Sequence, residues 1–205
     1  MILKRVIHKL GKLFNILPAN QRAEKRRIAK LRINKSSDIE RWVKNEELQT
    51  EWNSRTILLA DYVAKGANVI EFGAANGALK LILDNKATYQ GVDIVARDIE
   101  FLVCDLNWQP INIELSEYDT VILSGVFEYV YDISYVLNYF FDQNIKHVFF
   151  SYACSDISRE DRLLNGWLSD FKQVEVVSII TDSGFEIEET IDWKDQKLFI
   201  CHRVK

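Results

Sequence analysis

The stretch Val69-Ile-Glu-Phe-Gly-Ala-Ala-Asn-Gly77 carries most of the information about the fold of this 205-residue chain. It joins a short apolar strand to a turn bounded by Gly73 and Gly77, and a helical pattern follows at about 77–85. Glycine allows a tight backbone turn and lets a ligand approach the N-terminus of the helix. We therefore predict a strand–turn–helix unit whose turn binds a ligand.

Short apolar runs alternate with helical patterns along the rest of the chain. The further predicted strands are Tyr89–Asp93, Glu100–Cys104, Asp119–Leu123, Lys146–Ser151, Phe185–Ile191 and Lys197–His202. Helices are expected at about 50–64, with Ile57 on the buried side, and at 132–142 and 169–183. Such alternation favours a parallel sheet with crossover helices. The short Asp192–Gln196 connection predicts that the last two strands form an antiparallel hairpin.

A carboxylate at the end of the second strand indicates what the turn could bind. Asp93 stands 20 residues beyond Gly73, where the hydroxyls of a ribose would be held in a dinucleotide or S-adenosylmethionine site. The Gly-x-Gly-x-x-Gly spacing of a pyrophosphate site is absent, because Ala75 replaces its second glycine. Glu71 would also repel a pyrophosphate, whereas it suits a ligand with an ammonium and a sulfonium. This charge argument favours S-adenosylmethionine.

Several short motifs follow one another along the chain in a characteristic order. They are Val69–Gly77, Asp93, Cys104–Asn107, Val121–Val130 and Gly184-Phe185. Over roughly residues 50–203 the chain resembles the class I S-adenosylmethionine-dependent methyltransferases. The resemblance implies a Rossmann-like α/β fold: a seven-stranded, mostly parallel sheet with an antiparallel last strand and helices on both faces. We expect an N-terminal helical extension at 1–48 and a methyltransferase domain at 49–205.

The resemblance also implies how the methionine and ribose parts of the cofactor bind. The turn from Gly73 through Ala75 to Gly77 would cradle the methionine part, with Glu71 near its amino group. Asp93 would bind the ribose hydroxyls. Most relatives have a third glycine where Ala75 stands, which narrows the turn without forbidding binding.

Further positions correspond to the adenine and sulfonium ends of the cofactor. By the same resemblance, Asp105 would accept a hydrogen bond from the adenine amino group, and Leu106 would pack on the ring. Ser124 and Gly125, which end the fourth strand, would line the pocket beside the sulfonium.

A hydroxyl acceptor could require a base, whereas a carboxylate or phosphate oxygen would not. If a base is used, the candidates are residues after the fourth and fifth strands. We expect catalytic roles for Glu128, Tyr129 and Asp156, and we expect Trp167 to shape the acceptor side. His147 and His202 should lie at the opposite edge of the sheet. No metal site is predicted, because no group of His, Asp and Glu has ligand spacing with two imidazoles.

Three segments narrow the resemblance to a bacterial subgroup that is often encoded beside glycosyltransferases: Val92–Arg97, Val103–Asn107 and Leu163–Trp167. The acceptor expected from it is a small molecule or a glycan or polysaccharide precursor. Two alternatives stay open. One is a methyltransferase-like binding protein without catalysis, and the other is a methyltransferase directed to a membrane or to RNA by its basic N-terminal helices.

Charge is distributed unevenly along the chain. Residues 1–35 carry 11 Lys and Arg against one acid, Glu24, which gives a formal charge of +10. Because the net charge of the whole chain is −4, residues 36–205 carry a formal charge of −14. Helical patterns cover 2–17 and 22–32, and Ser37-Asp38 begins another helix through Trp42. Two interpretations stay open: the helices of this extension pack their apolar stripe on the domain with the charged face in solvent, or they contact an anionic membrane or an acidic partner. The acidic body argues against nucleic acid as its partner.

The remaining composition indicates a cytoplasmic protein, with the inner face of the membrane as an additional site for the basic extension. Its three cysteines, Cys104, Cys154 and Cys201, are widely spaced and odd in number, so we expect reduced thiols. Charged residues interrupt the N-terminal apolar run, unlike that of a signal peptide.

Overall fold

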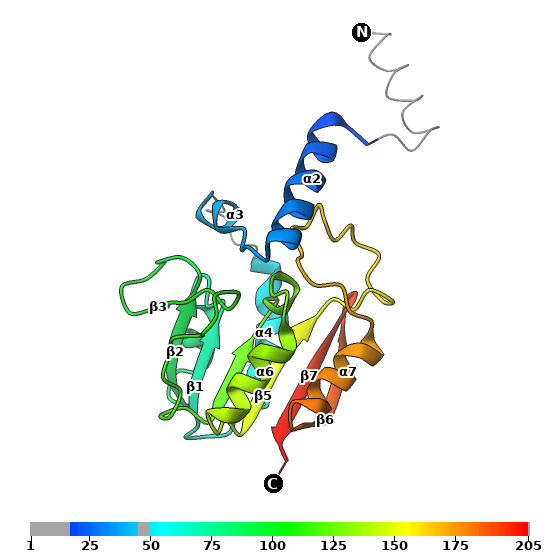
Figure 1. Cartoon of the computed structure of the whole chain (residues 1–205). Coiled ribbons are helices and arrows are strands. Elements are labelled where there is room, and N and C mark those ends of the chain that lie inside the picture. The colour runs from blue at the N-terminus through cyan, green and yellow to red at the C-terminus, as the bar shows by residue number, and fades with distance from the viewer. Residues whose placement is uncertain (1–16, 45–49, 205) are drawn as a thin grey trace.

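The computed structural model describes residues 17–44 and 50–204, and its centre is a seven-stranded sheet (Figure 1). In chain order the strands are β1 (Asn68–Phe72), β2 (Thr88–Asp93), β3 (Leu102–Val103), β4 (Thr120–Leu123), β5 (His147–Tyr152), β6 (Phe185–Trp193) and β7 (Gln196–Arg203). Their spatial order is β3-β2-β1-β4-β5-β7-β6. The first five strands are parallel, and β7 pairs antiparallel with both β5 and β6. The expected mostly parallel Rossmann-like sheet is confirmed.

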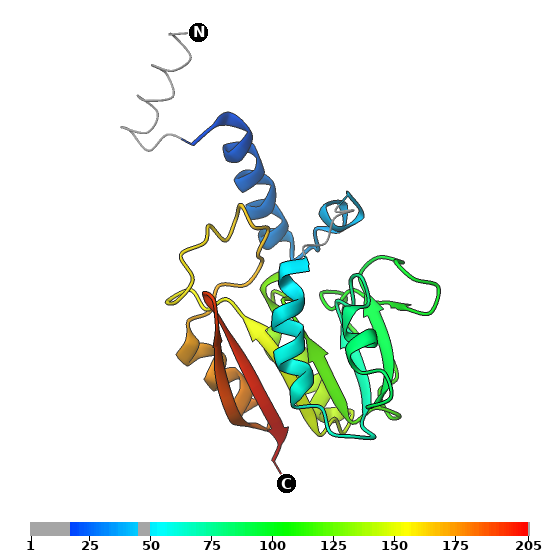
Figure 2. The same ribbon diagram turned by 180° about the vertical axis from the view of Figure 1, so that it is seen from behind.

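Helices cover both faces of the sheet. The described helices are α2 (Ala19–Asn34), α3 (Ile39–Lys44), α4 (Asn53–Asp61), α5 (Ala78–Ile82), α6 (Ile133–Asp142) and α7 (Gln173–Asp182), with short 3-10 turns η1 (Thr50–Trp52) and η2 (Phe127–Tyr129). Figure 1 shows α6 and α7 in front of one face, and Figure 2 shows α4 in front of the other. Residues 2–16 of the helical pattern predicted at 2–17 lie outside the described residues.

The two core clusters follow from the alternation of side chains along each strand. Val121 and Leu123 of β4 pack on the side of α6 and α7, whereas Ile122 between them packs on the side of α4 and α5. Because a parallel strand with helices on both faces is buried on both sides, it reads as a continuous apolar run. This explains why β1, β4 and β5 were evident in the sequence.

Three elements differ from their predicted forms. The third strand is two residues long, because Asp98 Oδ1 accepts a hydrogen bond from Glu100 N and holds the preceding residues in a turn. Helix α7 begins at Gln173, since the preceding Ser169 is held in place when its Oγ donates to Phe127 O. Ile57 was expected to be buried, but it is 46% exposed because α4 turns Thr56, Leu59 and Ala60 inward instead.

The described part of the N-terminal extension packs beyond the ends toward which the parallel strands point (Figures 1 and 2). Lys25 pairs with Asp161, and Arg32 Nε donates to Trp167 O at 2.8 Å. Arg41 Nη2 donates to Leu164 O at 3.1 Å. These contacts join α2 and the start of α3 to the loop between β5 and α7. Within residues 17–44 and 50–204, no helix is long and apolar enough to cross a membrane.

Substituting two glycines that share one backbone conformation distinguishes the cost of backbone strain from the cost of a steric clash. Gly66 and Gly184 have φ of 81° and 82°, but a Cβ at Gly66 would meet no atom within 4 Å, whereas one at Gly184 would lie 2.4 Å from Phe141 Cε2. We expect Gly66→Ala to cost about 1 kcal/mol of unfolding free energy. We expect Gly184→Ala to cost about 1–3 kcal/mol more, because the new methyl overpacks Phe141. Urea denaturation measures both, and equal losses would contradict the packing around Gly184.

Candidate active site

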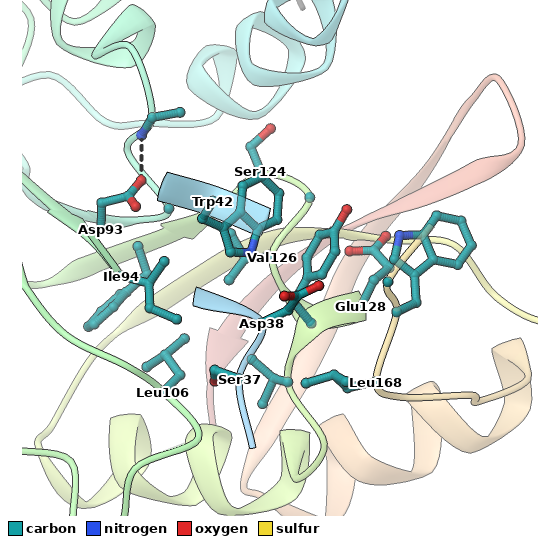
Figure 3. Close-up of a pocket in the computed structure, with 18 of the residues that line it drawn as sticks. Ser37, Asp38, Trp42, Asp93, Ile94, Leu106, Ser124, Val126, Glu128 and Leu168 are labelled. Atoms are coloured by element: carbon teal, nitrogen blue, oxygen red, sulfur yellow. Dashed lines mark hydrogen bonds between the residues drawn. The ribbon is translucent and has the colours of Figure 1, made fainter. Parts of the chain in front are cut away.

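A cavity of about 410 Å³ lies at the carboxyl ends of the central strands. Phe72 of β1, Asp93 of β2 and Ser124 after β4 contribute to its wall, which is the edge where α/β sheets bind ligands. The volume is that of a small-molecule site. Figure 3 shows side chains from the sheet and from the N-terminal extension around the cavity.

The glycine turn after β1 is held against β2. Gly73 N and Ala74 N both donate to Val92 O, at 2.8 and 2.9 Å. Gly73 has φ of 75°, and a Cβ there would lie 2.4 Å from Val126 Cγ2, so a larger side chain would clash. Ala75 adopts φ of 51°, which is uncommon for a residue with a Cβ. Its N donates to Asp93 Oδ2 at 2.9 Å, and this hydrogen bond supports the unusual conformation.

Asp93 ends β2 at the cavity wall and is almost fully buried. Besides the bond from Ala75, its Oδ1 accepts from Val95 N at 3.2 Å, and Arg97 Nε lies 3.4 Å from that oxygen. Backbone amides and one guanidinium therefore fix the orientation of the carboxylate.

Asp105 and Leu106 line the next part of the wall. Asp105 Oδ1 accepts from Ser37 Oγ at 2.7 Å and from Asn107 N at 2.9 Å. Its Oδ2 has no hydrogen-bond partner among the described residues, which leaves this oxygen for a ligand. Leu106 is buried beside it and offers an apolar surface.

Glu71 lies in a pocket of about 40 Å³ beside the main cavity, together with Gly73, Asn76 and Ser124. Its side chain is 3% exposed, and Tyr89 Oη donates to Oε2 at 2.6 Å. Burial raises the pKa of Glu71 to about 8, against the opposing effect of the Tyr89 hydrogen bond. Gly77 lines neither pocket. It precedes α5 with φ of 71°, and a Cβ there would be 3.2 Å from Phe101.

Arg55, which sequence reasoning missed, joins three walls of the cavity. It is 5% exposed, and it donates from Nε to Ser124 Oγ at 3.0 Å and from Nη1 to Gln196 Oε1 at 2.8 Å. Burial lowers its pKa. A Cβ at Gly125 would lie 2.2 Å from its Nη2, so glycine makes room for the guanidinium. The sequence held one signal for this role: Arg55 lies four residues before Leu59, and therefore on the buried face of the predicted helix.

Glu128 and Tyr129 lie at the other end of the cavity. Glu128 is 1% exposed, and its Oε1 accepts from Ala153 N at 2.8 Å. Its Oε2 is buried with no partner among the described residues. Burial raises the pKa of Glu128, while Arg55 acts in the opposite direction. Burial also raises the pKa of Tyr129 to about 12, and its ring meets Trp42 edge to face at 4.8 Å.

Asp156, the third expected catalytic residue, does not line the cavity. Its Oδ1 accepts from Gln173 N at 2.9 Å at the first residue of α7. The chain after β5 turns toward that helix, so the carboxylate supports the helix start. Asp156 therefore lies outside the lining of this cavity, and Glu128 is the acidic candidate that lines it.

The remaining walls come from segments that are distant in sequence. Ser37, Asp38 and Trp42 enter from the N-terminal extension, where sequence reasoning expected only the start of a helix (Figure 3). The loop Asn165–Leu168, which includes Trp167, and the hairpin residues Asp195 and Gln196 complete the cavity. His147 and His202 pair across strands at the opposite end of β5. The described ranges contain no cluster of three His, Cys, Asp or Glu side chains that could hold a metal ion.

Comparisons with solved structures agree with this architecture. The mitomycin 7-O-methyltransferase MmcR aligns with TM-score 0.55 at 15% identity over 75% of this chain and 54% of its own, so the chain spans about half its length. The magnesium protoporphyrin IX methyltransferase of Synechocystis, with bound S-adenosylhomocysteine, gives 0.55 at 18% identity, covering 81% and 94%. The 1,6-didemethyltoxoflavin-N1-methyltransferase of Burkholderia thailandensis gives 0.60 at 13%, covering 92% and 91%. At these identities, the likenesses show the fold.

The family comparison is more specific. No curated protein sequence matches the chain. A family model described as a methyltransferase domain matches residues 45–187, which hold the glycine turn, Asp93, Asp105 and Glu128. The chain thus belongs to the methyltransferase-domain family.

Proposed function

We propose that this chain uses S-adenosylmethionine to methylate a hydroxyl group of a polyhydroxylated small molecule or glycan precursor. The observation that carries this proposal is the buried Oε2 of Glu128, which has no partner among the described residues and belongs to a side chain lining the cavity. A buried acceptor without a donor costs free energy, which a hydroxyl group of the substrate would recover.

The cofactor fits the residues around the glycine turn. Its ammonium would pair with Glu71 in the small pocket, and its carboxylate would meet Arg55, which also borders that pocket. Gly73 and Ala75 would pass beneath the methionine chain, and the ribose hydroxyls would bind to Asp93. Gly77, which lines neither pocket, would serve only as the residue that precedes α5.

The adenine and the sulfonium would occupy the remaining walls. Asp105 Oδ2 would accept from the adenine amino group, with Leu106 against the ring. Ser124 and Gly125 would lie beside the sulfonium, and Glu128 follows them in the chain. When bound, the cofactor supplies an activated methyl group.

The acceptor end of the cavity combines aromatic and polar side chains. Tyr129 and Trp167 would offer aromatic surface to the C–H groups of a sugar, while Asn165, Glu160 and Asp195 would offer hydrogen-bonding groups to its hydroxyls. Alignment of the hydroxyl with the methyl group and exclusion of water would supply most of the rate. As the oxygen–methyl bond forms and the methyl–sulfur electron pair returns to sulfur, the hydroxyl proton would pass to Glu128 Oε2.

The exposed face of α2 favours an anionic membrane surface as the place of action. Arg22, Arg26 and Lys30 are exposed at spacings of four residues, whereas Lys25 and Arg32 contact the body. Ile33, 81% exposed, continues the same face. Cationic side chains beside an exposed apolar one are typical of helices that lie at a membrane interface. An acidic protein partner is the alternative for this surface.

The raised pKa of Glu71 makes cofactor binding depend on pH. Below about pH 8 the buried carboxyl is protonated, and an ammonium binds its ionised form. We expect the affinity for S-adenosylmethionine to rise by up to about tenfold per pH unit from pH 6 to 8, with proton release. Calorimetry in buffers of different ionisation enthalpy measures both effects. Glu71→Gln should abolish them, and an unchanged slope in that variant would contradict the placement of the ammonium.

Methyl transfer and the acceptor class are tested together with methyl-labelled S-adenosylmethionine and the small-molecule fraction of a cell extract. We expect labelled product, and we expect less after periodate treatment of the extract, because periodate cleaves vicinal diols. Glu128→Gln should lower the transfer rate by about 10²–10⁴-fold, since the proton acceptor is lost.

The exposed Glu117→Gln variant is the matched control, and calorimetry should show the same cofactor affinity in both variants. Absence of labelled product from the wild-type protein would favour the alternative of a binding protein without catalysis. Product that survives periodate would contradict the polyhydroxylated acceptor.

Membrane contact is tested by charge reversal on the full chain. The triple variant Arg22→Glu, Arg26→Glu, Lys30→Glu should bind vesicles containing phosphatidylglycerol at least about tenfold more weakly, because each cation contributes roughly 1 kcal/mol near an anionic surface. Lys65→Glu, Lys146→Glu, Arg159→Glu makes the same charge change at other exposed positions and should bind like wild type. Co-sedimentation measures both, and equal binding of the two variants would contradict the assignment.

A further inference from the structure

Ser37 connects the N-terminal extension to the carboxylate that we assign to adenine. It lies between α2 and α3, 68 residues from Asp105, and its Oγ is 2.7 Å from Asp105 Oδ1. Figure 3 shows Ser37 near Leu106, at the cavity wall. No motif in the body of the chain indicated this contact.

The direction of the Ser37 hydroxyl proton follows from its neighbours. Asn107 Nδ2 donates to Ser37 Oγ at 2.7 Å, and an amide nitrogen has no acceptor capacity. A carboxylate oxygen such as Asp105 Oδ1 accepts hydrogen bonds. The hydroxyl therefore accepts from Asn107 and donates to Asp105 Oδ1, which gives this oxygen its second donor beside Asn107 N.

Contacts on both sides hold Ser37 in place. The next residue, Asp38, is buried and pairs with Arg27 of α2 at 2.7 Å and with Arg41 of α3 at 3.2 Å. Farther along, Arg97 Nη2 donates to Trp42 O at 3.1 Å. Ion pairs within the extension and the hydrogen bond from Arg97 thus support the position of the Ser37 hydroxyl, in addition to the bonds that the hydroxyl itself makes.

We propose that Ser37 is a positioning residue for adenine recognition. By occupying Oδ1 of Asp105, it fixes the rotation of the carboxylate so that Oδ2 faces the adenine amino group. The inference rests on the proposed function, because it assumes that Asp105 binds adenine. It makes the N-terminal extension part of the cofactor site.

Hydrogen bonds through Asn107 also connect the Ser37 hydroxyl to the acceptor end of the cavity. Asn107 Nδ2 donates to Tyr129 O at 2.8 Å, and Asn107 Oδ1 accepts from Tyr131 N at 3.0 Å. A single amide therefore ties Ser37 to the backbone of the loop after β4, which carries Glu128. Displacing Ser37 would disturb the adenine wall first and that loop second.

The test compares S-adenosylhomocysteine with S-inosylhomocysteine, in which a carbonyl oxygen replaces the adenine amino group. The wild-type full chain should prefer the adenosyl ligand, because Asp105 Oδ2 accepts from an amino group and repels a carbonyl. Ser37→Ala should weaken adenosyl binding by about five- to tenfold. It should weaken inosyl binding less, because the freed carboxylate can rotate away. Calorimetry gives both affinities, and their ratio is a readout that general destabilisation would not change.

Three variants complete the design. Ser36→Ala is the neighbouring control, since Ser36 Oγ contacts only Asn34 O among the described residues and should leave the ratio unchanged. Ser37→Thr retains the hydroxyl and should keep the preference even if Ser37→Ala folds poorly. In an Asp105→Asn background, Ser37→Ala should change the ratio no further.

Each outcome has a separate meaning. If the wild-type protein binds neither ligand, the proposed function fails. If it prefers the adenosyl ligand and Ser37→Ala retains the full preference, or Ser37→Thr loses it, the positioning role of Ser37 is overturned while the cofactor site stands.

Discussion

The site depends on β1 and β4 being neighbours in the interior of the sheet. From β1 the chain goes outward to β2 and β3 on one side and then returns to β4 on the other. The connections that follow β1 and β4 therefore diverge, which leaves a crevice at the carboxyl ends of the strands. Val92 O fixes one side of this crevice by accepting from both Gly73 N and Ala74 N, and Val126 closes the other by packing over Gly73.

Three buried ionisable side chains then give the crevice its chemistry. Glu71, Arg55 and Glu128 are each at most 5% exposed. Desolvation disfavours their charged forms, which raises the pKa of the two acids and lowers that of Arg55. Such groups are costly to keep unless ligands complete their pairing. In our account the cofactor ammonium and carboxylate pair with Glu71 and Arg55, and the acceptor hydroxyl pairs with Glu128.

The sheet and the strand-end residues were predictable because they depend on local patterns. β1, β4 and β5 are buried on both faces, Asp93 is the last residue of β2, and Asp105 lies two residues beyond β3. The walls were not predictable, because they depend on contacts between distant residues. Arg27 with Asp38 and Arg32 with Trp167 O bring the N-terminal extension over the cavity, across separations of 11 and 135 residues. The location of Asp156 outside the cavity was not predictable for the same reason, since the group it binds, Gln173 N, lies 17 residues away.

The central claim is that one cavity, built from the strand ends and the N-terminal extension, holds S-adenosylmethionine in a defined orientation. A crystal structure of the full chain with S-adenosylhomocysteine tests this most directly. We expect the adenine amino group within hydrogen-bond distance of Asp105 Oδ2, the ribose hydroxyls on Asp93 and the amino group beside Glu71. A ligand bound elsewhere, or bound with its adenine away from Asp105, would contradict the account.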